Sequence, residues 1–99
     1  MSEPTRAYRF AVNVTPKPGI LDPQGKAVER SLPHLGIAGV SAVRVGRRVE
    51  LTVAGADEAA AAAVVDRLAG ELLSNPLMEL YEVEPLGEAA VPAVAGAGG

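Results

Sequence analysis

Three arginines within five residues, Arg44, Arg47 and Arg48, form the polar cluster of this sequence with the widest range of possible chemistry. A guanidinium presents planar pairs of N–H donors, which bind carboxylates and phosphates with two parallel hydrogen bonds. The cluster is either the solvated tip of a β-hairpin or a recognition site for a protein or ligand. The residues alone leave both interpretations open.

The other groups that could act in catalysis lack the partners that catalysis needs. His34 has no nucleophile and no orienting group at a suitable spacing, so a histidine at a helix end is favoured. Glu82 and Glu84 lie two apart on one strand, with Glu79 nearby, and paired carboxylates can bind a metal or exchange protons. A solvated strand face, or one that meets the bases of a partner, is favoured. Residues 15–19 lack the glycine spacing of a phosphate-binding loop, which leaves a rigid connector or a partner-contact loop.

Composition limits the protein to one small core. The chain has 99 residues, no cysteine and only 3% aromatic residues, so disulfides and thiolate metal sites are excluded. Small scaffolds of this kind commonly gain burial by association. No apolar run of membrane-spanning length and no secretory signal are found, so a cytoplasmic protein is expected. The scattered bases and few aromatics disfavour nucleic acid as a partner.

Opposite charges are separated along the chain. Residues 1–49 carry eight bases and three acids, whereas residues 50–99 carry one base and nine acids. This asymmetry favours charge complementarity, either within one chain or between subunits.

The first half of the sequence predicts a strand, a helix and a hairpin. Apolar residues alternate over 8–14, which predicts a half-buried strand. Asp22 and Pro23 form a strong helix start, Pro33 should kink or end the helix, and Gly36 should close it. The stripe Val28, Leu32 and Leu35 predicts that this helix rests on a sheet. Two alternating runs, 43–45 and 49–53, predict a hairpin that turns at Gly46-Arg47.

The second half predicts one more helix and one more strand. Apolar spacing over 57–73 indicates a long amphipathic helix that ends at Asn75-Pro76. A short strand follows over 80–84, at or near a sheet edge because Pro85 comes directly after it. The expected fold is therefore α+β, a βαββαβ ferredoxin-like antiparallel sheet with two helices on one face that dimerises. We expect a flexible N-terminus at 1–6, a single domain at 7–85 and a disordered Ala/Gly-rich tail at 86–99.

Residues 12–28 together with Leu32, Leu35-Gly36, 43–46 and 75–77 resemble the PurS family, the small subunit of phosphoribosylformylglycinamidine synthase. The block 17–28, which reads K-P-G-I-L-D-P-Q-G-K-A-V, is long and irregular enough to be specific, and the likeness covers residues 7–85. It implies a PurS-like, non-catalytic subunit in de novo purine biosynthesis. Such a subunit forms a homodimer or a tetramer, bridges a synthetase subunit and a glutaminase subunit, and supports the transfer of ammonia between them.

The resemblance places the cofactors elsewhere: it implies none on this chain, and ATP and magnesium on the synthetase partner. The chain itself then offers contact residues, with Asp22 chiefly a helix cap, and the candidates are Lys17, Asp22, Gln24, Lys26, Arg44 and Arg47. The alternative is a small dimeric ligand-binding regulatory module. A stand-alone enzyme of ferredoxin-like fold ranks last, because Arg9 and Asn13 alone do not make an acylphosphatase site.

Overall fold

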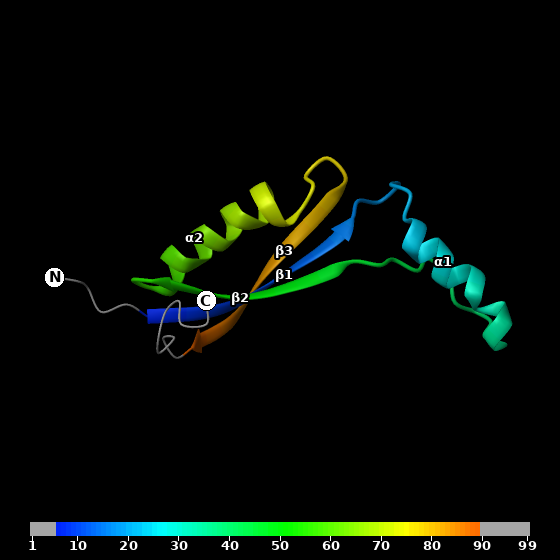
Figure 1. Ribbon diagram of the computed structural model, residues 1–99, viewed down its shortest axis with the longest axis horizontal. Coiled ribbons are helices and arrows are strands. Elements are labelled where there is room, and N and C mark those ends of the chain that lie inside the picture. The colour runs from blue at the N-terminus through cyan, green and yellow to red at the C-terminus, as the bar shows by residue number, and fades with distance from the viewer. Residues whose placement is uncertain (1–5, 90–99) are drawn as a thin grey trace, which may run out of the picture.

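The computed structural model describes residues 6–89, and its centre is an antiparallel sheet of three strands in the order β2-β1-β3 (Figure 1). Strand β1 spans Arg6–Pro16, β2 spans Arg47–Gly55 and β3 spans Glu79–Ala89. Alternation in β1 directs one row of apolar side chains to one face, as predicted. All four of them are buried: Tyr8, Phe10, Val12 and Val14. The central position of β1 explains why the small Ala7 and Ala11 are also buried on the other face.

Helix α2, Glu58–Leu68, covers this apolar face and continues as a π-helical segment, Ala69–Leu73. Asp57 caps it, because the Ala60 amide donates to Asp57 Oδ1 at 2.8 Å. The residues that α2 and its extension turn towards the sheet are small, Ala61, Val65 and Ala69, and all are 0% exposed. Small side chains let the helix approach β1 closely. The predicted helix over 57–73 is confirmed.

Helix α1, Pro23–Ser31, begins and ends where its local signals predict. The Gly25 amide donates to Asp22 Oδ1 at 3.0 Å, and Pro23 occupies the first turn. Pro33 ends the regular helix, and a 3-10 turn, Pro33–Leu35, follows. Gly36 adopts a left-handed φ of 71°, which closes the helix as a glycine cap does.

The position of α1 corrects the expectation that two helices cover one face of the sheet. Figure 1 shows α1 beyond one end of the sheet, while α2 alone lies over the strands. The stripe predicted to rest on a sheet is open instead, with Val28 42% and Leu35 70% exposed. The physical reason lies in the chain that returns from α1, which is bonded to α1 rather than to β1.

That return segment, residues 37–46, also corrects the predicted hairpin. No strand forms over 43–45, and β2 starts only at Arg47, so the described residues form three strands rather than four. The Val43 amide donates to Glu29 Oε2 and the Val45 amide to Asp22 Oδ2, both at 2.8 Å. Backbone donors that a strand would have paired are thus satisfied by carboxylates at α1.

Strand β3 is the edge strand that Pro85 predicts, but it is longer than expected. The register shifts between Arg9 and Phe10, so that Phe10 faces Pro85 and Arg9 faces Gly87. This irregularity accommodates a proline that cannot donate to the ladder, and the strand continues to Ala89. The predicted tail at 86–99 is therefore wrong for residues 86–89. Its remainder, 90–99, and residues 1–5 of the predicted N-terminus lie outside the described residues, while Arg6 already belongs to β1.

Within residues 6–89, no helix has both the length and the apolar character that crossing a membrane requires.

Candidate functional site

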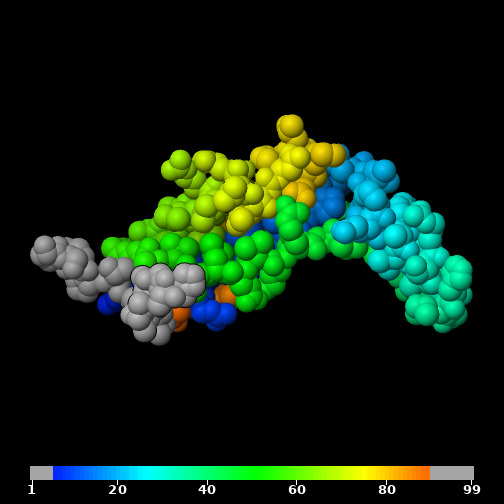
Figure 2. Space-filling model, in the orientation of Figure 1, coloured from blue at the N-terminus to red at the C-terminus, as the bar shows by residue number. Residues whose placement is uncertain are grey.

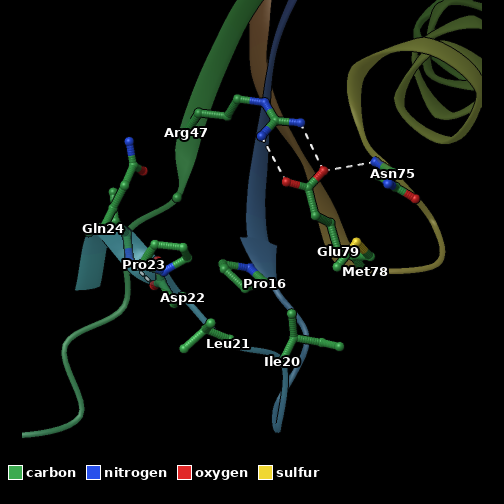
Figure 3. A pocket seen from close by; sticks show the side chains of 12 residues that line it. Pro16, Ile20, Leu21, Asp22, Pro23, Gln24, Arg47, Asn75, Met78 and Glu79 are labelled. Carbon is green, nitrogen blue, oxygen red and sulfur yellow. Dashed lines mark hydrogen bonds and ion pairs between the residues drawn. The ribbon is translucent and has the colours of Figure 1, made fainter. Parts of the chain in front are cut away.

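An open cleft of about 710 Å³ lies where α1 joins the sheet (Figure 3). Three of the six candidate contact residues line it: Asp22, Gln24 and Arg47. Figure 3 shows the side chains of Arg47 and Glu79 turned towards each other, with Asp22 and Pro23 at the start of α1. Ile20, Leu21, Met78 and Pro16 give the cleft an apolar component. The sheet, the start of α1 and the turn before β3 therefore meet at this point.

Arg47 holds three elements of its own chain together. Its guanidinium donates two hydrogen bonds of 2.9 Å to the Glu79 carboxylate, and a further bond of 2.6 Å to the Leu73 carbonyl. Glu79 also accepts from the Asn75 amide at 2.8 Å. These bonds lower the pKa of Glu79, chiefly through Arg47, and raise the pKa of Arg47. Arg47 thus links β2, β3 and the end of the α2 extension.

Asp22 uses both carboxylate oxygens within the chain. Oδ1 accepts from the Gly25 amide at 3.0 Å, and Oδ2 accepts from the Val45 amide at 2.8 Å. These bonds, the one from Val45 first, hold the pKa of Asp22 below its usual value. Asp22 caps α1, as the sequence predicts. Its second carboxylate oxygen also holds the return segment against α1.

We predict that protonation of Asp22 in acid breaks its hydrogen bond to the Val45 amide. The pKa of Asp22 is lower in the folded chain than its value of 3.8 in the unfolded chain. The ionised carboxylate therefore stabilises the fold fully above pH 3.8, and this stabilisation is lost as the pH falls through the lower pKa of the folded chain. The Val45 amide should therefore show its bonded NMR shift at neutral pH and lose it in this acidic window. The Asp22→Asn variant serves as the control and should show no such transition. A Val45 shift that follows the same acid titration in both proteins would contradict the assignment.

The other three candidates do not line the cleft. Lys17 is half-buried, and its backbone amide donates to the Met78 carbonyl at 2.9 Å. Lys26 is exposed and lies 3.7 Å from Glu29 within α1. Arg44 is exposed and forms no ion pair with any residue of 6–89, although its charge contributes to the lowered pKa of Asp22. The structure thus divides the candidates into residues that line the cleft and residues that flank it.

Arg48 lies on the face of the sheet opposite α2 and forms a separate network. It bonds Glu84 Oε1 at 2.9 Å and Glu50 Oε2 at 3.0 Å, and Asn13 also donates to Glu84 at 3.3 Å. Glu84 has a lowered pKa, chiefly because of Arg48. The arginine cluster of the sequence is therefore split between two networks. The pairs Arg47–Glu79 and Arg48–Glu84 confirm that bases of the first half meet acids of the second half within one chain.

Sequence reasoning missed the residues that fix the return segment. Nothing in the sequence around Glu29, apart from its charge, indicated that it would bond to the return segment. Gly25 and Gly46 are required by close backbone approach, because a Cβ at Gly25 would clash with the Val43 carbonyl oxygen and one at Gly46 with the Val14 carbonyl oxygen. His34 is exposed in the 3-10 turn, at a helix end as predicted. Among residues 6–89, no three histidine or carboxylate side chains gather in a way that could hold a metal ion.

Fold and site define a small α+β protein in which the charged groups of the cleft hold its own elements in place. Residues 9–87 match the PurS family, described as phosphoribosylformylglycinamidine (FGAM) synthase. The chain is 40% identical to the phosphoribosylformylglycinamidine synthase subunit PurS of Synechocystis, over 89% of this chain and 90% of that protein. The PurS subunit of Thermotoga maritima is 33% identical over 80% of this chain and 96% of its own length. The chain belongs to the PurS family.

Solved structures agree with this assignment. The crystal structure of the PurS subunit of Thermotoga maritima superposes with a TM-score of 0.77 at 31% identity, covering 85% of this chain and 97% of that one. A chain in the structure of PurLQS from the same organism gives a TM-score of 0.74 at 32% identity, covering 81% of this chain and 98% of that one. The family and the α+β fold predicted from the sequence are therefore confirmed.

Proposed function

We propose that this chain is the non-catalytic small subunit of phosphoribosylformylglycinamidine synthase in de novo purine biosynthesis. In this role it associates with itself as a dimer or tetramer and bridges a synthetase subunit and a glutaminase subunit in the cytoplasm. ATP and magnesium belong to the synthetase partner. The observation that carries the proposal is the match to the PurS family over residues 9–87, together with the likeness to a chain of PurLQS.

The contribution of such a subunit is positional. Ammonia released at one active site must reach a second site before it escapes or is protonated, and holding two sites in a fixed relation favours that transfer. The internal bonding of the cleft supports this role, because Arg47 and Asp22 are occupied in fixing the chain's own shape. The sequence also has no cysteine that could act as a glutaminase nucleophile.

The six candidate residues divide accordingly. We propose that Lys17, Gln24, Lys26 and Arg44 offer direct contacts to the larger subunits. Gln24, Lys26 and Arg44 are exposed, and Lys17 is half-exposed. Asp22 and Arg47 act indirectly, since they fix the position from which those contacts are made.

Reconstitution tests the proposal. The synthetase and glutaminase subunits of the same organism are assayed with glutamine or with ammonium as nitrogen source, with and without this chain. We expect the chain to restore glutamine-dependent turnover, to change ammonium-dependent turnover much less, and to have no amidotransferase activity alone. Full glutamine-dependent activity without it would eliminate the proposal.

A small dimeric ligand-binding regulatory module is the second candidate function, and the cleft of about 710 Å³ is the observation that favours it. Calorimetry of the isolated chain with glutamine, glycine and nucleotides separates the two. Saturable binding would favour the regulatory module, whereas the bridging role requires none.

A further inference from the structure

The turn that joins the α2 extension to β3, residues 74–78, carries the most exposed large apolar side chain of the described residues. Leu77 is 83% exposed, and Met78 beside it is 48% exposed. Figures 1 and 2 show this turn standing out at the top of the view, between the α2 extension and β3. Single exposed apolar residues are ordinary on a protein surface, so the exposure of Leu77 does not by itself indicate a site.

Hydrogen bonds within the turn hold its backbone in one conformation. The Asn75 carbonyl accepts from the Met78 amide at 3.0 Å and from the Glu79 amide at 2.7 Å. Asn75 Oδ1 accepts from the Leu77 amide at 3.1 Å, and the Asn75 amide donates to Glu79 Oε1 at 2.8 Å. The Lys17 amide donates to the Met78 carbonyl at 2.9 Å, which ties the turn to the chain that leaves β1. Leu77 is therefore presented by a fixed backbone.

Side chains outside the turn fix its two ends. Arg47 donates to the Leu73 carbonyl, which precedes the turn, and to the Glu79 carboxylate, which follows it. Ser74 Oγ donates to the Ala69 carbonyl at 2.7 Å, across the α2 extension. A side chain that is exposed and already held in position loses little conformational freedom on binding, so more of its contact energy is available for affinity. Leu77 meets this condition.

The charge around the turn distinguishes between the partners of the proposed function. Residues 66–82 carry four acids and one base, a net charge of −3. The same turn of a second copy carries the same charge, so two such turns would repel each other. The synthetase subunit binds ATP, and proteins that bind polyanions carry basic surfaces that attract them, whereas glutamine has no net charge at neutral pH. An acidic surface therefore fits the synthetase better than the glutaminase.

We propose that the turn 74–78 docks on the synthetase subunit, with Leu77 filling an apolar pocket whose rim carries basic residues. An aliphatic side chain in a pocket, surrounded by a polar rim, is a common centre of a protein interface. The acids around the turn meet that rim, and the hydrogen bonds of Asn75 and Glu79 hold Leu77 in position for the pocket. The inference rests on the bridging role in the proposed function and names one surface that serves it.

Truncation of Leu77 tests the contact without disturbing the fold, because the side chain is exposed. This chain is titrated into fixed amounts of the synthetase and glutaminase subunits until glutamine-dependent turnover saturates. Leu77→Ala should raise the half-saturating concentration about tenfold or more and leave the saturated turnover near its original value. Val64→Ala is the matched control, because Val64 is 47% exposed on α2 and lies outside the turn, and it should change neither quantity. An unchanged half-saturating concentration in Leu77→Ala would overturn the proposal.

A site-specific cross-link identifies the subunit that the turn contacts. The sequence has no cysteine, so Met78→Cys introduces a single thiol beside Leu77 and leaves Leu77 in place. A benzophenone maleimide attached to this thiol is illuminated in the reconstituted complex, and mass spectrometry identifies the cross-linked chain. The label should attach to the synthetase subunit. Attachment to the glutaminase subunit, or to a second copy of this chain, would overturn the proposal.

A further variant tests whether the fixed backbone of the turn matters. Glu79→Ala removes the acceptor of the Asn75 amide, so hydrogen exchange at Asn75 should accelerate about tenfold. The half-saturating concentration should rise as well, although Leu77 is unchanged. Glu84→Ala is the matched control, because Glu84 also pairs with an arginine but lies on the face opposite α2. Faster exchange at Asn75 with an unchanged half-saturating concentration would overturn the role of the fixed turn.

Failure of this contact and failure of the proposed function give different results. Turnover that depends on this chain, but with equal half-saturating concentrations for Leu77→Ala and the original chain, would overturn the contact alone. Glutamine-dependent turnover that needs no addition of this chain would overturn the proposed function, and the docking of the turn with it.

Discussion

Replacing Phe10 by alanine should lower the free energy of unfolding by about 3–5 kcal/mol, the range typical of a buried phenylalanine removed from a core. Phe10 is 1% exposed on the central strand and belongs to the single cluster that β1 forms with Ala61, Val65 and Ala69 of α2 and its extension. Typical domains are stable by only about 5–15 kcal/mol, so this loss would remove much of the total. The core is too small to offer a substitute contact.

Urea unfolding at fixed protein concentration measures the effect of Phe10→Ala, since association contributes to apparent stability. Leu77→Ala is the control: it removes a similar apolar group from a side chain that is 83% exposed and should change stability by less than about 0.5 kcal/mol. Equal unfolding midpoints for the two variants would show that β1 and α2 do not form the stabilising core.

Replacing Gly25 by alanine should detach the return segment from α1. In a helix interior this change gains up to about 1 kcal/mol from helix propensity. Here the added Cβ would clash with the Val43 carbonyl oxygen and would come 2.8 Å from Asp22 Oδ2. Overpacking against such neighbours costs about 1–3 kcal/mol, and a backbone carbonyl cannot rotate aside as a side chain can. The cost of the clash should exceed the gain in helix propensity, and the return segment should loosen from α1.

Hydrogen exchange of the Val43 and Val45 amides reports this change directly, because both are bonded to carboxylates at α1. We expect exchange at both positions to accelerate about tenfold, which corresponds to about 1.4 kcal/mol. Amides of β1 should keep their protection. Gln24→Ala is the matched control, since Gln24 is exposed in the same helical turn. Unchanged exchange in Gly25→Ala would show that Gly25 is not needed to hold the return segment against α1.

Local signals predicted the elements whose causes are local. The cap at Asp22, the helix end at Pro33 and the left-handed Gly36 each depend on residues within a few positions, and each was found where expected. Alternation in β1 predicted its buried row, and the apolar spacing over 57–73 predicted Ala61 and Val65 of the core. Val64 and Leu72 of the same predicted stripe are exposed instead. These patterns are readable from the sequence because neighbouring residues decide them.

Errors arose where distant groups decide the structure. Val43 and Val45 alternate as in a strand, but their amides bond to Glu29 and Asp22, which lie 14 and 23 residues earlier. Spacing along the chain carries no signal of that choice. The length of β3 was missed for the same reason, because a shift opposite Arg9 and Phe10 in another strand admits Pro85.

The sequence predicted which residues belong to the candidate site better than it predicted what each of them does. Arg47 was expected to reach a partner or a ligand, yet Glu79 and the Leu73 carbonyl occupy its guanidinium. Asp22 was expected to cap a helix and also fastens the return segment. The sequence shows that charges are present and cannot show that they satisfy each other within the chain.

Together with the family assignment, these bonds indicate a subunit whose charged groups fix its own shape. That shape sets the surfaces that the larger subunits would contact. Glutamine-dependent turnover of the synthetase and glutaminase subunits, compared with and without this chain, tests that role most directly. The chain should raise the turnover from near background to the level of the complete complex while catalysing nothing alone. Equal turnover in its presence and absence would contradict the account.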